Sequence, residues 1–137
     1  NNILELGCYH GLSTTIMTQA LKDAGNKGTM TTLDVFEENI NKTKANVQKQ
    51  TPDVKIKYEV ADAINFVLSN NNKYDLIFVD ANHTYDWMKI LTQKLSTVAE
   101  GKIVFHDFFH KNTGVQKAVE EVLGSTKNKI GSIGVYE

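Results

Sequence analysis

The chain has 137 residues, of which 41% are hydrophobic, and its 15 basic residues against 16 acidic ones leave a net charge of −1. This length suits one domain with its own core, and so balanced a charge offers no basic surface for a nucleic-acid backbone or an anionic membrane. No apolar run approaches the roughly 20 residues that span a bilayer. A single cysteine, Cys8, excludes an internal disulfide and fits a reducing compartment, so we expect a cytoplasmic protein.

Short apolar runs alternate with amphipathic stretches from the start of the chain. Residues 3–6 predict a strand that is broken by glycines, and Ser13 is expected to cap a helix that ends before Gly25. A second strand at 29–33 ends at an aspartate, and a helix follows over about 37–50, before Pro52. The predicted inward faces of these two helices are Ile16, Met17, Ala20, Leu21 and Ala24 for the first, and Ile40 and Val47 for the second.

The same alternation continues to the end of the chain. A third strand is predicted around 54–60, a fourth at 76–79 and a fifth at 103–105. The run 76–79 is continuously apolar, as in a strand that is buried on both faces of a parallel sheet. One or two short strands are expected within 129–136. The inward faces of the last three helices are predicted as Ala63, Ile64, Val67 and Leu68; Met88, Leu91, Leu95 and Val98; and Val115, Ala118, Val119 and Val122.

Five strand–helix units with short connections predict a doubly wound, Rossmann-like α/β fold. Its sheet is mostly parallel, with helices on both faces and right-handed crossovers. We expect a single domain over residues 1–137. The chain begins Asn1-Asn2 without an initiator methionine, which is compatible with a trimmed fragment that lacks N-terminal covering helices.

Acidic side chains recur where the predicted strands end, and ligands of open α/β sheets bind at that edge. Several carboxylates repel a polyphosphate, but they suit a ligand with an ammonium group, a ribose diol and an exocyclic amine, as in S-adenosylmethionine. Each acid taken alone has a simpler interpretation as a solvated loop residue or a helix N-cap. The acids are Glu5, Asp34, Asp62, Asp80 and Asp107, and all four histidines, His10, His83, His106 and His110, are predicted on the same rim.

The turn after the first strand reads Gly7-Cys8-Tyr9-His10-Gly11. A dinucleotide site uses G-x-G-x-x-G, whose middle glycine lets the backbone approach the pyrophosphate. Here Tyr9 occupies that position, which disfavours a nicotinamide-dependent dehydrogenase. Asp34, at the end of the second strand, matches the carboxylate that binds ribose hydroxyls in doubly wound nucleotide sites.

The stretch from Glu5 to Ser13, ELGCYHGLS, resembles the first motif of the catechol O-methyltransferase-like enzymes, within the class I S-adenosylmethionine-dependent methyltransferases. The resemblance implies that glycines of this turn approach the methionine moiety and that a serine holds its carboxylate. It also implies ribose binding by Asp34 and adenine contacts after the third strand. The cofactor-binding residues expected on this basis are Glu5, Gly7, Cys8, Tyr9, Gly11, Ser13, Asp34, Val35, Asp62, Ala63 and Asp80, with no chemical role for Cys8.

Three later segments, FVDANHTY from Phe78, VFHD from Val104 and GVQKAV from Gly114, are similar to macrocin-type small-molecule O-methyltransferases. Two features depart from the related metal-dependent enzymes. Those enzymes carry a carboxylate pair or Asp-Asn after the fifth strand, where this chain has His106-Asp107. The N-terminal helices that commonly cover the acceptor pocket are also absent from the sequence.

The resemblance implies methyl transfer to a hydroxylated small molecule, and the chemistry of the residues leads us to expect Asp80 and His83 as catalytic residues. A cation held by Asp80 and Asp107 would lower the pKa of the acceptor hydroxyl, and carboxylates favour Mg²⁺ or Mn²⁺. His106 is either a third ligand or points into the sheet. His83 is either the general base or a residue that orders a helix start.

Other interpretations stay open at this point. The chain is either an O-methyltransferase or a non-catalytic cofactor-binding module that needs a partner chain. A homodimer is one of the oligomeric states that stay open. Trp87, Phe108 and Phe109 either wall an acceptor pocket or belong to the core.

Overall fold

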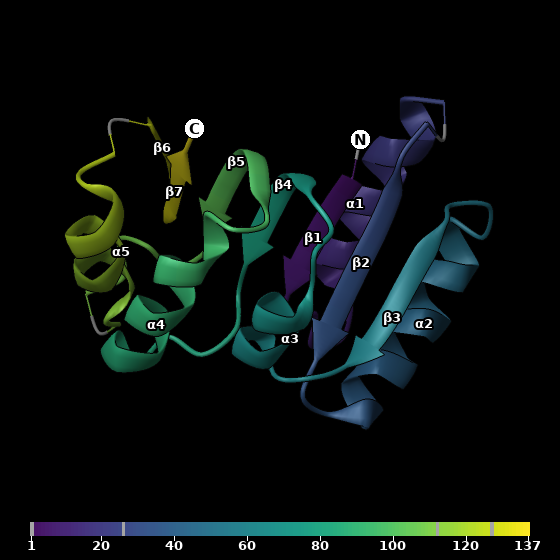
Figure 1. The fold of residues 1–137 in the computed structure, drawn as a ribbon. Coiled ribbons are helices and arrows are strands. Elements are labelled where there is room, and N and C mark those ends of the chain that lie inside the picture. The colour runs from purple at the N-terminus through teal and green to yellow at the C-terminus, as the bar shows by residue number, and fades with distance from the viewer. Residues whose placement is uncertain (1, 26, 112, 127) are drawn as a thin grey trace.

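A computed structural model describes residues 2–25, 27–111, 113–126 and 128–137, and over these ranges the chain forms one seven-stranded sheet flanked by helices (Figure 1). The elements in chain order are β1 (Asn2–Leu6), α1 (Leu12–Asp23), β2 (Thr29–Asp34), α2 (Glu37–Gln50), β3 (Ile56–Val60), α3 (Ala63–Ser69), β4 (Tyr74–Val79), α4 (Tyr85–Leu95), β5 (Ala99–Phe105), α5 (Val115–Leu123), β6 (Asn128–Ile130) and β7 (Ile133–Tyr136).

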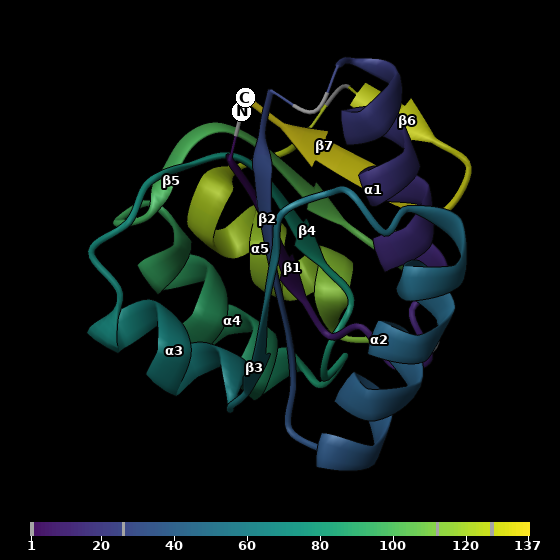
Figure 2. The ribbon, with the colours of Figure 1, turned by 90° about the vertical axis from the view of Figure 1, so that its right-hand side faces the viewer.

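The strand order is β3-β2-β1-β4-β5-β7-β6, with the first five strands of the chain parallel and β7 antiparallel to both β5 and β6. Two helices, α1 and α2, cover one face, and α3, α4 and α5 cover the other (Figure 2). The chain leaves β1 in one direction toward β3 and returns to β4 on the other side. The predicted doubly wound fold is confirmed, and its switch point lies between β1 and β4, where such folds bind ligands.

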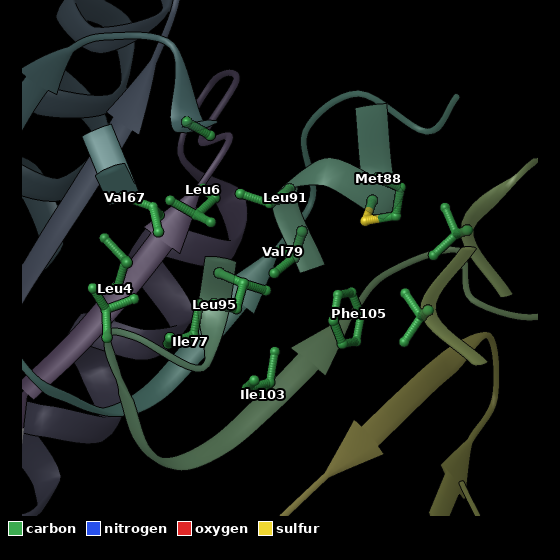
Figure 3. Packing of buried hydrophobic residues seen from close by; sticks show 14 of the residues in the cluster. Leu4, Leu6, Val67, Ile77, Val79, Met88, Leu91, Leu95, Ile103 and Phe105 are labelled. Carbon is green, nitrogen blue, oxygen red and sulfur yellow. The ribbon is translucent and has the colours of Figure 1, made fainter. Parts of the chain in front are cut away.

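The core lies mainly between the sheet and α4. Ile77, Val79 and Phe105 have no exposed surface and pack in one cluster with Met88 and Leu91 of α4 (Figure 3). Burying each such side chain contributes about 1.5–3 kcal/mol. The predicted inward stripe of α4 is confirmed, although Val98 lies past the end of the helix.

The predicted inward face of α1 is confirmed for Leu21, which is buried, and for Met17, which packs against the core, but it is wrong for the exposed Ile16, Ala20 and Ala24. Ile16 is 62% exposed, whereas Thr14, Thr15 and Thr18 are buried with Leu21. The reason is that each of these threonine hydroxyls donates a hydrogen bond within the fold, and a buried hydroxyl costs little when it has a partner.

Three smaller predictions also differ from the structure. Ser13 does not cap α1, because the residue before the helix is Gly11, in the left-handed conformation, and no side chain caps it. Leu68 is exposed on α3. The third strand begins at Ile56, after a turn in which the Val54 N–H donates to the Thr51 carbonyl.

The end of the chain forms two short strands, β6 and β7, in line with the one or two expected there, and they pair as an antiparallel hairpin. Within the described ranges, no helix combines the length and apolarity that crossing a bilayer requires.

Candidate functional site

The turn after β1 passes directly against the end of β4. Gly7 has φ +95, and its N–H donates to the Leu33 carbonyl at 3.0 Å. A Cβ atom at Gly7 would lie 2.3 Å from the carbonyl oxygen of Asp80, so glycine is required here on steric grounds. Gly11 is likewise packed against Thr43. The turn therefore packs between the end of β4 and the middle of α2.

A crevice of about 360 Å³ opens beside this turn at the carboxyl ends of the strands. We call it the main crevice. Its volume lies in the range of small-molecule sites. Seven of the residues predicted to bind a cofactor line it, together with Leu33, Phe36, Asn39, Ala61, Ala81, Asn82 and Trp87; the seven are Gly7, Tyr9, Asp34, Val35, Asp62, Ala63 and Asp80.

Asp34 is held rigidly at the wall of the main crevice. One carboxylate oxygen, Oδ2, accepts the Tyr9 N–H at 3.0 Å, and the other, Oδ1, accepts the Phe36 N–H and the Asn39 side-chain amide at 3.0 Å each. Asp34 is consequently only 8% exposed. The carboxylate is oriented before any ligand arrives, which lowers the entropic cost of binding.

Asp62 has two structural roles. It is the N-cap of α3, where its Oδ1 accepts the Asn65 N–H at 3.0 Å, so the simpler interpretation that the sequence left open for each acid describes this residue. It also faces the main crevice beside Ala63. The capping bond fixes its side chain in that position.

Glu5 does not line the main crevice, contrary to the prediction that all the strand-end acids share it. Its side chain is fully buried and accepts hydrogen bonds from Ser13 at 2.5 Å, Thr14 at 2.5 Å and Thr32 at 2.6 Å. Burial raises the pKa of Glu5, although the three hydroxyls act in the opposite direction. The carboxylate supports the glycine turn by tying β1 and β2 to the start of α1.

A second hollow, of about 320 Å³, lies across the turn from the main crevice. It shares Gly7, Tyr9 and Asp80 with the main crevice, and its further lining residues are Cys8, His10, Leu12, Ser13, Ile16, Phe78 and His106. Cys8 and Ser13 thus face this hollow, not the main crevice. Gly11 lines neither space.

Four side chains gather where β4 and β5 end, and we call Asp80, His83, His106 and Asp107 the His/Asp cluster. Asp80 Oδ1 lies 3.3 Å from His83 Nε2 and 3.1 Å from His106 Nδ1. Asp107 lies 3.8 Å from His83 Nδ1, through Oδ2, and 3.5 Å from His106 Nδ1, through Oδ1. The pKa of His83 is raised mainly by the neighbouring Asp80 carboxylate, which stabilises the protonated imidazole.

Two nitrogens of this cluster are unusual. His83 Nε2 and His106 Nδ1 are buried, and neither has a hydrogen-bond partner among the described residues, although Asp80 Oδ1 lies 3.3 and 3.1 Å from them. The structure turns His106 toward Asp80 and the second hollow, so the alternative that it points into the sheet is wrong. Asp80, His83 and His106 each offer one ligand atom, and these atoms lie within 4.8 Å of one another.

The other histidines and aromatic residues fall outside this cluster. His10 stacks on Tyr9 with ring centroids 3.7 Å apart, while His110 is exposed near α5. Phe108 is fully buried in the core, and Trp87 lines the main crevice. The sequence leaves His83 as either a general base or a residue that orders a helix start, and it does not indicate that His83 Nε2 lies close to both Asp80 and His106.

Comparison with known proteins agrees with this architecture. A family described as "Methyltransferase domain" matches residues 4–108, and no curated protein matches the chain. An O-methyltransferase from Bacillus cereus, solved in complex with SAH, superposes with a TM-score of 0.73 at 15% identity, covering 98% of this chain and 72% of that one.

Two further solved structures have similar scores. A SAM-dependent O-methyltransferase from Thermotoga maritima has a TM-score of 0.72 at 16% identity, over 92% of this chain and 44% of that one. Monomeric WbdD has 0.71 at 18% identity, over 98% and 35%. The chain spans less than half the length of several structures that it matches. At these identities the likeness establishes the shared fold.

Proposed function

The chain belongs to the methyltransferase domain family, and on that premise we propose that it binds S-adenosylmethionine and transfers the methyl group to a hydroxyl of a small molecule. The observation that carries the proposal is the main crevice, where Asp34, Asp62 and Asp80 meet beside a glycine turn that a Cβ atom would block. Such a site offers hydrogen-bond acceptors to a ligand that is rich in donors.

The adenosine half suits the part of the main crevice that Asp34 and Asp62 line. Oδ2 of Asp34 accepts one hydrogen bond from the protein, which leaves acceptor capacity for a ribose hydroxyl. Asp62 uses Oδ1 for its cap and offers Oδ2 to an exocyclic amine. Val35 and Phe36 are 53% and 66% exposed at this site, and their apolar surfaces suit the face of a purine ring.

The methionine half suits the border that the main crevice shares with the second hollow, which Gly7, Tyr9 and Asp80 line. The backbone carbonyl of Asp80, which packs against Gly7, suits an ammonium group. Ser13 lies in the second hollow. Its hydroxyl donates to Glu5, and we propose that it turns to donate to the ligand's carboxylate.

Methyl transfer needs the acceptor oxygen, the methyl carbon and the sulfur in line. S-adenosylmethionine supplies an activated methyl group when bound. The chain's own contribution is to hold the two reactants at the His/Asp cluster and to remove the hydroxyl proton. Either His83 accepts that proton, or a cation bound in the cluster lowers the pKa of the hydroxyl.

Calorimetry with the demethylated product, S-adenosylhomocysteine, tests the binding half of the proposal. We expect a saturable heat for the intact chain and a weaker one for Asp34→Ala, with exposed Asp53→Asn as the matched control. Absence of heat from a folded sample at high micromolar ligand would contradict the proposal. Turnover of a panel of hydroxylated small molecules then separates an enzyme from a module that binds the cofactor without catalysis.

A further inference from the structure

We propose that Asp80, His83 and His106 bind a first-row transition-metal cation of the Zn²⁺ or Co²⁺ kind in preference to Mg²⁺. His83 is then a metal ligand, and Asp107 orients it. The part of this cation in methyl transfer rests on the proposed function, whereas cation binding itself does not.

The fold brings the three ligands together from distant parts of the chain. Val79 and Phe105 are paired in adjacent parallel strands, so the next residues, Asp80 and His106, emerge side by side. Val79 and Phe105 point into the core, and Asp80 and His106, which directly follow them, therefore point to the other face. His83 comes from the following loop, which is pinned because the Gly114 N–H donates to the His83 carbonyl at 3.0 Å.

The distances between ligand atoms match a shared cation. Imidazole nitrogens and carboxylate oxygens bind such cations at about 2.0–2.2 Å. Two ligands at that distance, separated by 90–110°, lie roughly 3–3.5 Å apart. Asp80 Oδ1 lies 3.1 Å from His106 Nδ1 and 3.3 Å from His83 Nε2, which falls within this range.

A cation also resolves the two unpartnered nitrogens. A buried polar atom without a hydrogen bond is unfavourable, and both His83 Nε2 and His106 Nδ1 are in this state while lying close to the same oxygen, Asp80 Oδ1. A metal ion between the three atoms satisfies all of them at once.

Asp107 lies beside both histidines, with Oδ1 3.5 Å from His106 Nδ1, and we assign its other oxygen to the orientation of His83. That oxygen, Oδ2, lies 3.8 Å from His83 Nδ1, the ring nitrogen that does not face the ligand set. Metal-binding histidines commonly donate their second ring N–H to a carboxylate, which fixes the ring and its tautomer. Asp107 has φ +49, and its carbonyl accepts the Thr113 hydroxyl at 3.1 Å, so a costly backbone conformation is maintained at this residue.

The ligand types decide the kind of cation. Mg²⁺ prefers oxygen ligands and keeps several waters, whereas imidazole suits zinc and its neighbours. Two imidazoles and one carboxylate therefore replace the all-oxygen set that Asp80 and Asp107 suggest from sequence. Three ligands leave coordination positions for an exogenous group, and Asp80 and His106 also line the second hollow. An acceptor hydroxyl that reaches the cation from this hollow would lose its proton more easily.

The test is titration of the metal-free full chain with Co²⁺, followed by its visible absorption and by calorimetry, then competition with Zn²⁺ and Mg²⁺. We expect one Co²⁺ per chain with absorption bands typical of nitrogen ligands, displaced by Zn²⁺ and retained in excess Mg²⁺. His83→Ala and His106→Ala should each weaken binding by more than roughly 100-fold, and Asp107→Asn by about 10–100-fold, the usual effect of losing a supporting carboxylate. Exposed His110→Ala is the matched control and should bind as the unaltered chain does.

Several results would overturn the proposal. These are no Co²⁺ bands, displacement by equimolar Mg²⁺, or unchanged Co²⁺ affinity in a folded His83→Ala chain. If a variant fails to fold, the spectrum and the Mg²⁺ competition of the unaltered chain still decide the matter. S-adenosylhomocysteine binding, measured on the same metal-free sample, reports separately on the proposed function.

Discussion

Replacing Gly7 with alanine tests how closely the glycine turn approaches the end of β4. A left-handed backbone costs an alanine roughly 1–2 kcal/mol. The new Cβ would also lie 2.3 Å from the Asp80 carbonyl oxygen, so the two backbone segments must separate by about 1 Å to reach ordinary contact. Forced repacking of this kind costs about 1–3 kcal/mol. We therefore expect Gly7→Ala to lower the free energy of unfolding by roughly 2–5 kcal/mol.

Gly25→Ala is the matched control, because Gly25 has φ +84 but its nearest neighbour, Lys27 Cε, is 3.9 Å from the Cβ position. Only the conformational cost of roughly 1–2 kcal/mol applies there. Urea unfolding of both variants isolates the contact with Asp80 as the difference between them. Equal losses in the two variants would refute the close approach on which the shape of the main crevice depends.

Three further substitutions probe individual carboxylates. Asp34→Ala should weaken S-adenosylhomocysteine binding by about 10–100-fold, as loss of one or two hydrogen bonds to a charged group implies; calorimetry against Asp53→Asn measures it, and equal affinities would contradict the role of Asp34. Asp62→Ala should lower the free energy of unfolding by about 1 kcal/mol through loss of the α3 cap, and an unchanged urea midpoint would argue against that cap. Burial raises the pKa of Glu5 above its ordinary value of 4.5. Between the ordinary pKa and the raised one, the folded state binds more protons than the unfolded state, so the contribution of Glu5 to stability falls as pH rises. The unfolding free energy of the unaltered chain minus that of Glu5→Gln should accordingly decrease from about pH 4.5 upward and then level off; a difference that does not change with pH would refute this.

The doubly wound fold was predictable because its signals are local. Continuously apolar strands such as 76–79 and the stripe on α4 each follow from spacing alone. The buried threonines on the inward face of α1 were not predictable in this way. They depend on partners elsewhere in the fold, such as Glu5 for the Thr14 hydroxyl and Thr51 for that of Thr18.

The same distinction applies to the candidate site. Asp34 and Asp80 reach the main crevice because each follows or ends a parallel strand, which the sequence indicates. Glu5 sits within its strand, so its orientation depends on which face α1 covers. The position of His83 depends on a contact with Gly114, 31 residues later in the chain, and no local pattern reveals it.

A structure of the chain soaked with S-adenosylhomocysteine tests the central claim most directly. We predict ribose hydroxyls within hydrogen-bond distance of the Asp34 carboxylate, the adenine beside Asp62 and Ala63, and the amino-acid end passing Gly7 toward Ser13. A ligand bound away from the main crevice, or seated there with its ribose out of reach of Asp34, would contradict it.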